Sequence, residues 1–349
     1  MKRYSIFFLF VFLYTGLYAQ KNKENITVHS KAVAFAKTAP LSELPLQLSP
    51  DKQDAIHIEN EVKNFFNVEK WEHTDKNARP GSVQTKQGER SGRGPIVGFN
   101  GQGGTGFVPP DTDGDVSNEH YVQMVNSKYN VYEKDGTKIL GPLDLSTLWS
   151  QLPGGPWGNS GDPIVLYDED ADRWILTQFA PKNNYSENYE LFAVSQTSDP
   201  TGAYYLYAFE FGGIFNDYPK MGVWTDGYYA TYNLFSNNYN PSFIGSKITV
   251  VERDKMLIGD PDASMVEFLK TGYYATMPAD IDGETQPAEG EPCPVMYITN
   301  AKTIQLWGFS VDWETPGNSY LNLMTTLILT YCSEYNGSVP QPNGNGLDA

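Results

Sequence analysis

A repeated unit of short strands constrains the fold of this chain more than any other feature of its sequence. Each unit opens with Asp beside or near Pro, and the openings at Pro110, Pro163, Pro219 and Pro278 follow one another at intervals of 53, 56 and 59 residues. Each opening leads into apolar and aromatic runs separated by Asp- and Gly-rich turns, the pattern of antiparallel strands joined by tight connections. Four-stranded units at about this spacing are typical of β-propeller blades.

The clearest unit predicts four strands, at 164–168, 173–180, 189–195 and 204–211. The neighbouring units predict further strands at 120–126, 129–133, 221–225, 228–235, 295–299 and 304–312. A 14% content of aromatic residues agrees with strands, because flat side chains suit a pleated surface. We therefore predict an all-β fold, a β-propeller, with a β-sandwich as the alternative that any run of short strands would satisfy.

The predicted β domain, residues 95–349, has room for only four such units. Its last stretch, 342–349, is rich in Gly and Asn and contains no closing strand. A ring of blades that is left open exposes an unpaired strand edge, which natural sheets avoid. We therefore expect the propeller to be incomplete in this chain and the chain to be part of a longer protein.

The N-terminal part differs from the strand repeat. Basic residues precede an apolar run at 6–13, and the small residue Ala19 follows it, so we predict a signal peptide over residues 1–19. Residues 20–94 are polar, and we expect a largely irregular leader there. The pattern within 51–66, acidic residues followed by spaced apolar ones, predicts at most one short helix.

Charge limits the partners of the chain. Residues 1–95 carry 14 Lys and Arg against 10 Asp and Glu, whereas residues 96–349 carry 11 against 32, a net charge of −21. An acidic surface repels phosphate backbones, so we expect no nucleic acid partner. Beyond the signal peptide no apolar run approaches the ~20 residues of a membrane helix, so we expect no membrane insertion after its removal and a secreted or cell-surface location.

Whether the only two cysteines, Cys293 and Cys332, form a disulfide stays open.

Two stretches carry longer motifs. Residues 109–112 (Pro-Pro-Asp-Thr) precede 120–123 (His-Tyr-Val-Gln), and 161–168 (Gly-Asp-Pro-Ile-Val-Leu-Tyr-Asp) precede 171–174 (Ala-Asp-Arg-Trp). With these motifs the chain resembles a family of exported, mostly uncharacterised bacterial proteins whose repeats look like propeller blades. The resemblance covers about residues 95–349 and implies a propeller fold and a secreted protein. It brings no established catalytic residues.

Several kinds of catalytic chemistry have few residues to use. His120 is the only imidazole among the predicted strands, which disfavours multi-His metal sites and His-dependent nucleophiles. Residues 158–161 (Gly-Asn-Ser-Gly) look like a serine protease loop, but Asn replaces the required Asp, and we interpret them as a turn. Sialidases hold the carboxylate of their substrate with three Arg. The strand region has only Arg173 and Arg253, which disfavours sialidase activity. Glycoside hydrolysis by two carboxylates stays open, with its residues unknown.

Alternate carboxylates at Asp111, Asp113 and Asp115 suggest a possible cation site. Three carboxylates at this spacing can direct oxygen atoms at one hard cation such as Ca²⁺. The match to an EF-hand loop is partial, because Gly stands at the fourth position and Val122 at the twelfth. The alternative is that Asp and Gly only form a turn here, and the Asp residues at 168, 170 and 172 pose the same question.

These features lead to one main functional hypothesis and one alternative. We expect an exported binding module for glycans or proteins, acting outside the cell or at its surface, with Ca²⁺ as its candidate cofactor. The alternative is a secreted polysaccharide hydrolase that uses paired carboxylates. A funnel at the propeller axis lined by two carboxylates and aromatic side chains would favour the hydrolase, and a flat rim would favour binding alone.

Overall fold

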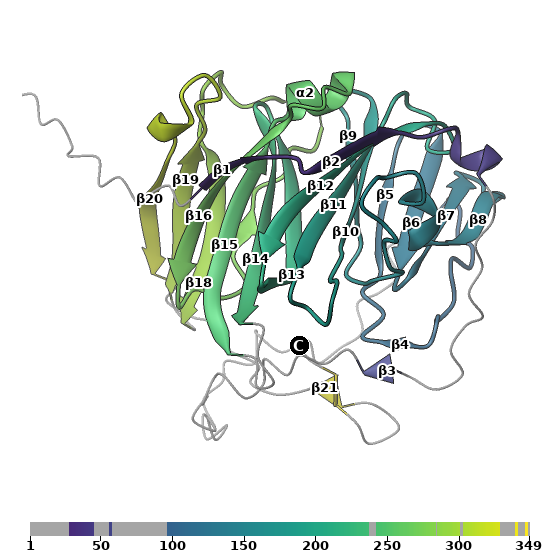
Figure 1. Cartoon of the computed structure of the whole chain (residues 1–349), viewed down its shortest axis with the longest axis horizontal. Coiled ribbons are helices and arrows are strands. Elements are labelled where there is room, and N and C mark those ends of the chain that lie inside the picture. Colours follow the sequence, from purple (N-terminus) through teal and green to yellow (C-terminus); the bar gives the residue numbers. More distant parts are fainter. Residues whose placement is uncertain are drawn as a thin grey trace, which may run out of the picture.

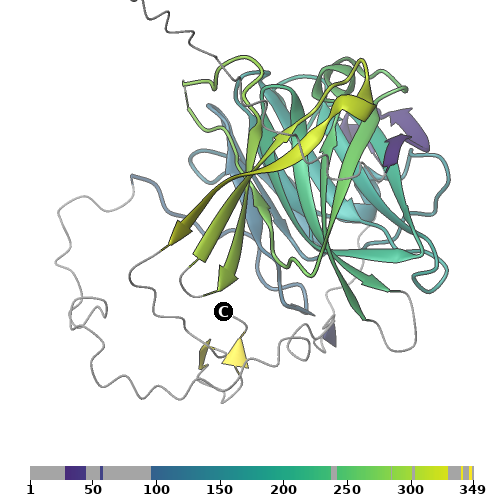
Figure 2. The same cartoon turned by 90° about the vertical axis from the view of Figure 1, so that its left-hand side faces the viewer.

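The structure, a computed structural model, describes residues 28–44, 56–57, 96–236, 242–283, 285–300, 303–328, 339–340 and 346–347. Within these ranges the chain forms four successive antiparallel sheets of four consecutive strands, and β1 or β2 adds a fifth strand to two of them. The first strand of each sheet contacts the first strand of the next. Figures 1 and 2 show the sheets fanned side by side about these first strands, as blades of a β-propeller are. The predicted all-β propeller is confirmed, and the β-sandwich is not formed.

Each of the four blades contains four consecutive strands. Blade 1 comprises β5 (Asp113–Val116), β6 (His120–Val125), β7 (Lys128–Glu133) and β8 (Lys138–Asp144). Blade 2 comprises β9 (Ile164–Asp168), β10 (Arg173–Phe179), β11 (Asn188–Ser195) and β12 (Tyr204–Gly212). Blade 3 comprises β13 (Ile214–Trp224), β14 (Gly227–Ser236), β15 (Phe243–Val251) and β16 (Ser264–Thr271). Blade 4 comprises β17 (Met277–Pro278), β18 (Cys293–Asn300), β19 (Thr303–Ser310) and β20 (Tyr320–Ile328).

The remaining elements are short. They are β1 (Val28–Lys31), β2 (Ala34–Lys37), β3 (Ile56–His57), β4 (Phe107–Val108), β21 (Val339–Pro340), β22 (Gly346–Leu347), α1 (Leu145–Leu148), α2 (Arg253–Ile258) and the 3₁₀ turns η1 (Leu41–Glu43) and η3 (Pro316–Asn318). Pairing joins β3 to β4 and β21 to β22. Among the described residues, no helix has the length and apolar character that crossing a membrane requires.

The predicted strands agree closely with the observed ones. The strand predicted at 164–168 is β9 with the same bounds. The strand predicted at 189–195 differs from β11 by one residue at its start, and that predicted at 228–235 differs from β14 by one residue at each end. The turn chemistry explains this agreement. Asp and Gly residues form the turns between consecutive strands, and each apolar run between two turns is long enough for a buried strand.

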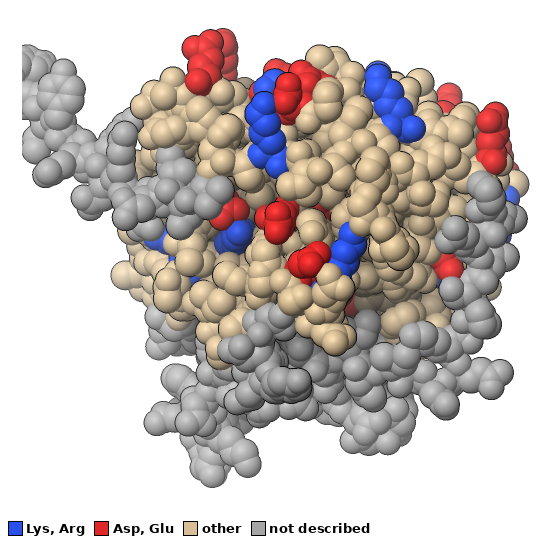
Figure 3. Space-filling model, viewed as in Figure 1, with Lys and Arg blue, Asp and Glu red and all other residues tan. Residues whose placement is uncertain are grey.

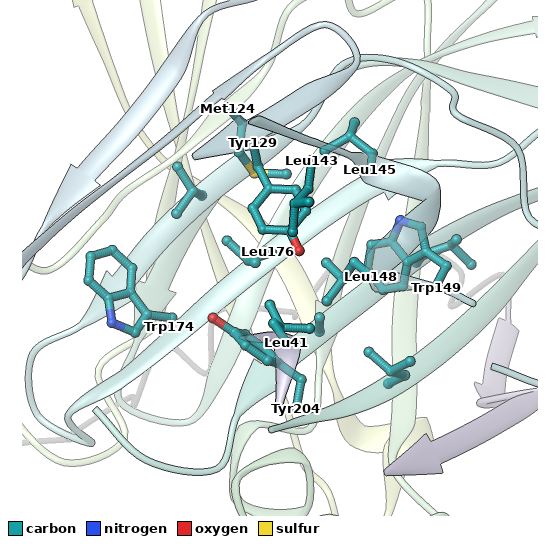
Figure 4. Packing of buried hydrophobic residues seen from close by; sticks show 14 of the residues in the cluster. Leu41, Met124, Tyr129, Leu143, Leu145, Leu148, Trp149, Trp174, Leu176 and Tyr204 are labelled. Carbon is teal, nitrogen blue, oxygen red and sulfur yellow. The ribbon is translucent and has the colours of Figure 1, made fainter. Parts of the chain in front are cut away.

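Apolar packing between neighbouring blades holds the fold together. One cluster of buried residues lies between blades 1 and 2, a second between blades 2 and 3, and a third between blades 3 and 4. Figure 4 shows the first cluster, where Trp149 and Leu148 at α1 face Leu41 and Tyr204. The aromatic residues of the strands therefore serve largely as packing between blades.

Part of the N-terminal leader is more ordered than the sequence analysis expected. Residues 28–44, expected to be irregular, add β1 as an outer strand beside β16 and β2 as an outer strand beside β12. Figure 1 shows both strands, in purple, running across the outer side of blades 3 and 2. The physical reason is that a strand of only four residues needs few apolar side chains. Such a strand does not stand out from the polar composition of the leader as a whole.

Other features expected of the termini lie outside the described residues. These are the signal peptide at 1–19, most of the helix predicted within 51–66, and Cys332. Of the predicted helix, only residues 56–57 are described, and they form β3. Cys293 is buried and free.

Because the leader packs on the blades, we predict that Leu41→Ala destabilises the protein. Leu41 is 1% exposed and lies in the cluster between blades 1 and 2. Removing a buried leucine side chain costs about 2–5 kcal/mol of unfolding free energy. Urea unfolding measures this cost. Val33→Ala is the matched control, because Val33 is 55% exposed in the same segment. Equal unfolding midpoints for the two variants would mean that the leader does not contribute to the core.

Candidate functional site

The inner strands of the blades begin with a repeated backbone conformation. Asp111, Asp162, Tyr218 and Ala275 have φ values of 40°, 48°, 52° and 48°, and each directly precedes a Thr or Pro. Three of them lie two residues before a first strand, whereas Tyr218 lies within β13. Left-handed backbone is uncommon for residues other than Gly, and Asp tolerates it better than most. In blades 1 and 2 the Asp that opens the sequence repeat is itself the left-handed residue, whereas Tyr218 and Ala275 take this position in blades 3 and 4.

This conformation brings three carboxylates together from three blades. Asp162, which precedes β9, hydrogen-bonds through its side chain to both Asp111 and Asp217. Asn126 supports the group from blade 1, because its amide donates to Asp111 and its Oδ1 accepts the backbone N–H of Asp162 at 2.9 Å. Gly161 is required here, since a Cβ at this residue would lie 2.8 Å from Asn126 Oδ1. We call Asp111, Asp162 and Asp217 the acid triad.

The triad residues differ in how firmly each holds a proton. Burial, then the charges of Asp217 and Asp111, raise the pKa of Asp162 well above its ordinary value. Burial raises the pKa of Asp217 to about 6, with Asp111 adding to the effect. Burial also raises the pKa of Asp111, but hydrogen bonds from Asp162 and Asn126 and the nearby Lys220 act in the opposite direction. The surroundings therefore favour the protonated form most strongly at Asp162, whereas Lys220 favours the ionised form of Asp111.

Two tyrosine side chains are exposed close to the triad. Tyr185 and Tyr218 are 41% and 42% exposed. The ring of Tyr185 meets Phe215 edge to face at 5.0 Å, and the ring of Tyr218 stacks on Tyr274 at 6.4 Å. Lys220 Nζ lies 4.1 Å from the centroid of the Tyr218 ring. These partners orient the two tyrosines and leave flat surfaces beside the carboxylates.

A fully buried polar group lies behind the triad. Glu190 on β11 is 0% exposed and accepts a hydrogen bond from Asn216 Nδ2 at 2.8 Å. Asn216 directly precedes Asp217, so Glu190 fixes the backbone from which that carboxylate projects. Burial and the charge of Asp162 raise the pKa of Glu190 well above its ordinary value, which keeps the carboxyl neutral.

The three predicted metal ligands have different surroundings. Asp111 belongs to the acid triad, whereas Asp113 and Asp115 accept the backbone N–H groups of Val165 and Tyr167 at 2.8 and 2.7 Å. In the part of the chain that the structure describes, no three His, Cys, Asp or Glu side chains form a group that could hold a metal ion. Ca²⁺ binding at these residues stays a prediction.

The second acidic run pairs with a cation of the chain itself. Arg253 Nε and Nη2 donate to the two carboxylate oxygens of Asp168 at 2.6 and 2.9 Å, and Nη2 also reaches Asp170 at 3.0 Å. Asp172 instead accepts from the hydroxyl of Tyr167. This arrangement ties the end of β9 to α2 and gives Asp168 and Asp170 a structural role.

Sequence reasoning identified only one member of the triad. It selected Asp111 for its neighbours at 113 and 115, and it used the Asp residues at 162 and 217 only as markers of the repeat. The signal that could have found them is the repeat itself. Equivalent positions of successive propeller blades meet at one end of the axis, so the Asp of each opening was a candidate.

Comparisons with known proteins find only distant similarity to solved structures. No family model matches the chain, and no curated protein matches it. Solved structures with some similarity include a candidate exo-β-1,3-galactanase from Bifidobacterium bifidum, with 13% identity over 67% of this chain and 95% of that one, at a TM-score of 0.32. An exo-β-1,3-galactanase from Phanerochaete chrysosporium shares 10% identity over 61% and 59% of the two chains, and a GH32 β-fructofuranosidase from Bombyx mori shares 13% over 62% and 47%, both at 0.32. The function proposed below rests on the geometry of the chain itself.

We predict that Asp217→Asn stabilises the protein at pH 8. The native pKa of about 6 exceeds the unfolded value near 4, so the native state binds the extra proton, and stability falls as pH rises through this interval. A shift of about two pKa units corresponds to at most about 3 kcal/mol. Urea unfolding at pH 8 and pH 4 measures the gain, which should vanish at pH 4. Glu133→Gln, an exposed carboxylate of β7, is the control. An equal change at both pH values would contradict the prediction.

Ca²⁺ binding is tested by thermal unfolding. A cation bound only to the native state stabilises it by about 2.7 kcal/mol at a hundred times its Kd. A site of defined oxygens should prefer Ca²⁺ to Mg²⁺, whereas screening of acidic side chains depends mainly on ionic strength. We expect a higher midpoint in Ca²⁺ than in Mg²⁺ or EDTA at matched ionic strength, and a smaller difference in Asp113→Ala. A difference that the substitution leaves unchanged would exclude this loop as the site.

Proposed function

We propose that this chain is an exported glycoside hydrolase that cleaves polysaccharide with the acid triad. The observation that carries the proposal is the hydrogen-bonded position of Asp162 between Asp111 and Asp217, beside two exposed tyrosine rings. A neutral carboxyl group and an ionised carboxylate in one site are the pair that glycosidic bond cleavage uses. Export, predicted from the first 19 residues, is part of the proposal.

The surroundings assign a role to each carboxyl group. Asp217, with a pKa of about 6, is the general acid that gives its proton to the oxygen of the leaving sugar. Asp111, held by Asn126 and close to Lys220, is the carboxylate that activates water or attacks the sugar. Asp162 keeps its proton and donates its single O–H to Asp111, which orients that carboxylate and lowers its pKa.

The aromatic surfaces give a physical reason for a sugar substrate. The exposed rings of Tyr185 and Tyr218 offer flat apolar faces for the C–H faces of a pyranose or furanose ring, and the carboxylates accept hydrogen bonds from its hydroxyl groups. A site with this mixture of faces and acceptors suits a neutral polyhydroxylated ligand.

A second candidate is the binding of glycans or proteins without hydrolysis. The position of Asp162 favours it. This carboxyl group lies between Asp111 and Asp217, whereas an inverting glycosidase admits a water molecule between two carboxyl groups about 6.5–9.5 Å apart. Activity on polymers distinguishes the two candidates.

We predict that the purified protein releases reducing sugar from at least one of xylan, arabinan, galactan, mannan, fructan and β-glucan. Because general acid–base groups contribute about 10²–10⁴-fold, Asp111→Asn and Asp217→Asn should each lose at least about a hundredfold in rate. The general acid must be protonated, so the rate should fall as pH rises above about 6, approaching tenfold per pH unit.

The matched control is Glu133→Gln, which removes an exposed carboxylate from blade 1 and should keep full activity. If the two triad variants retain the wild-type rate, the assigned roles are wrong. If the wild type hydrolyses none of the polymers but binds one of them, the second candidate replaces the first.

A further inference from the structure

A groove of about 680 Å³ lies on the outer side of blade 2. Its walls are the loop 153–158, the hairpin 181–187 between β10 and β11, and the start of β2 at Ala34. Tyr189 and Glu210 complete it from β11 and β12. The volume is within the range of small-molecule sites, and the groove is separate from the acid triad.

The walls of the groove are held in place before any ligand binds. Lys182 Nζ lies 3.3 Å from the centroid of the Trp157 ring and donates to the carbonyl of Gly154 at 2.5 Å. The indole of Trp157 donates in turn to the carbonyl of Leu152 at 3.0 Å and meets Tyr189 edge to face at 5.3 Å. A preformed wall of this kind reduces the entropy cost of binding.

The polar groups of the groove suit hydroxyl groups better than a charged ligand. Glu187 is positioned by Asn183 Nδ2 at 2.8 Å and by the hydroxyl of Tyr189 at 3.3 Å. Glu210 is exposed at the groove. Two carboxylates and one ammonium group do not concentrate charge of one sign, and Figure 3, which views the face that carries β2, shows acidic and basic side chains interspersed. Acceptors beside aromatic faces are the chemistry of a neutral polyhydroxylated ligand.

One hairpin connects the groove to the acid triad. Lys182 and Glu187 line the groove, whereas Tyr185, in the same hairpin, packs on Phe215. Burial and, after it, the nearby charge of Asp217 raise the pKa of Tyr185. Residues 182 and 185 are three positions apart, at most about 11 Å along the chain. A linear ligand that crosses this hairpin can therefore reach both places.

We propose that the groove binds sugar units of the same glycan chain that the acid triad cleaves, remote from the scissile bond. This inference rests on the proposed function and extends it, because it assigns the substrate to long chains and not to small glycosides. Binding energy from remote units then adds to the affinity for the polymer and contributes nothing to a short glycoside.

The experiment compares oligosaccharides of three to eight units. Xylo-, arabino-, galacto- and fructo-oligosaccharides are titrated calorimetrically into Asp111→Asn, which should bind without cleavage. We expect affinity for eight units to exceed that for three by at least tenfold. Adding Glu187→Gln and Glu210→Gln should reduce this ratio to below threefold, and adding Glu133→Gln should not change it. In the wild-type background the same pair should raise KM for the polymer more than it changes kcat.

The outcomes separate this inference from the proposed function. Hydrolysis by the wild type, together with a length ratio that the two groove substitutions leave unchanged, overturns the inference alone. A length ratio that these substitutions abolish, with no hydrolysis of any polymer by the wild type, overturns the hydrolase and leaves the groove as a glycan site. No binding of any oligosaccharide overturns the inference.

Discussion

Carboxylates that accept backbone N–H groups across blade boundaries are the interaction on which this structure depends. The first strands of neighbouring blades belong to different sheets, so no ladder satisfies their facing N–H groups. Asp113 and Asp280 supply acceptors to Val165 and Val223 at 2.8 and 2.7 Å. Asp162 similarly accepts the backbone N–H of Tyr218. The acidic composition of the β domain is therefore partly a structural requirement at the propeller axis.

The candidate site follows from the same constraint. Asp111, Asp162 and Asp217, from the first three blades, lie close together, and burial raises the pKa values of these carboxyl groups. A protonated Asp162 carries no charge and can donate its one O–H to Asp111, which makes the close approach of three acidic groups tolerable. Residues that join the blades thus become residues capable of acid–base chemistry, with Asn126 and Glu190 holding them from behind.

Ion pairs and outer strands complete the joints between blades away from the axis. The buried pair of Asp168 and Arg253 links blade 2 to the helix of blade 3. Such a pair is costly to break, because either partner alone would be left charged and buried. The segment of β1 and β2 crosses the outer strands of the same two blades, and Leu41 continues it into the core between blades 1 and 2. Blades 2 and 3 are therefore joined at their inner and outer margins.

The sequence by itself determined the all-β class, the blade repeat and most strand bounds, because strand and turn signals are local. It also pointed to Asp111. Only the tertiary structure decided that Asp162 and Asp217 meet that residue, since their separation of 51 to 106 positions along the chain says nothing about distance in space. The role of Arg253, the burial of Glu190 and the pairing of the leader were likewise hidden. Each depends on a partner from another blade, and the physical effects concerned, burial and charge proximity, exist only after the blades have packed.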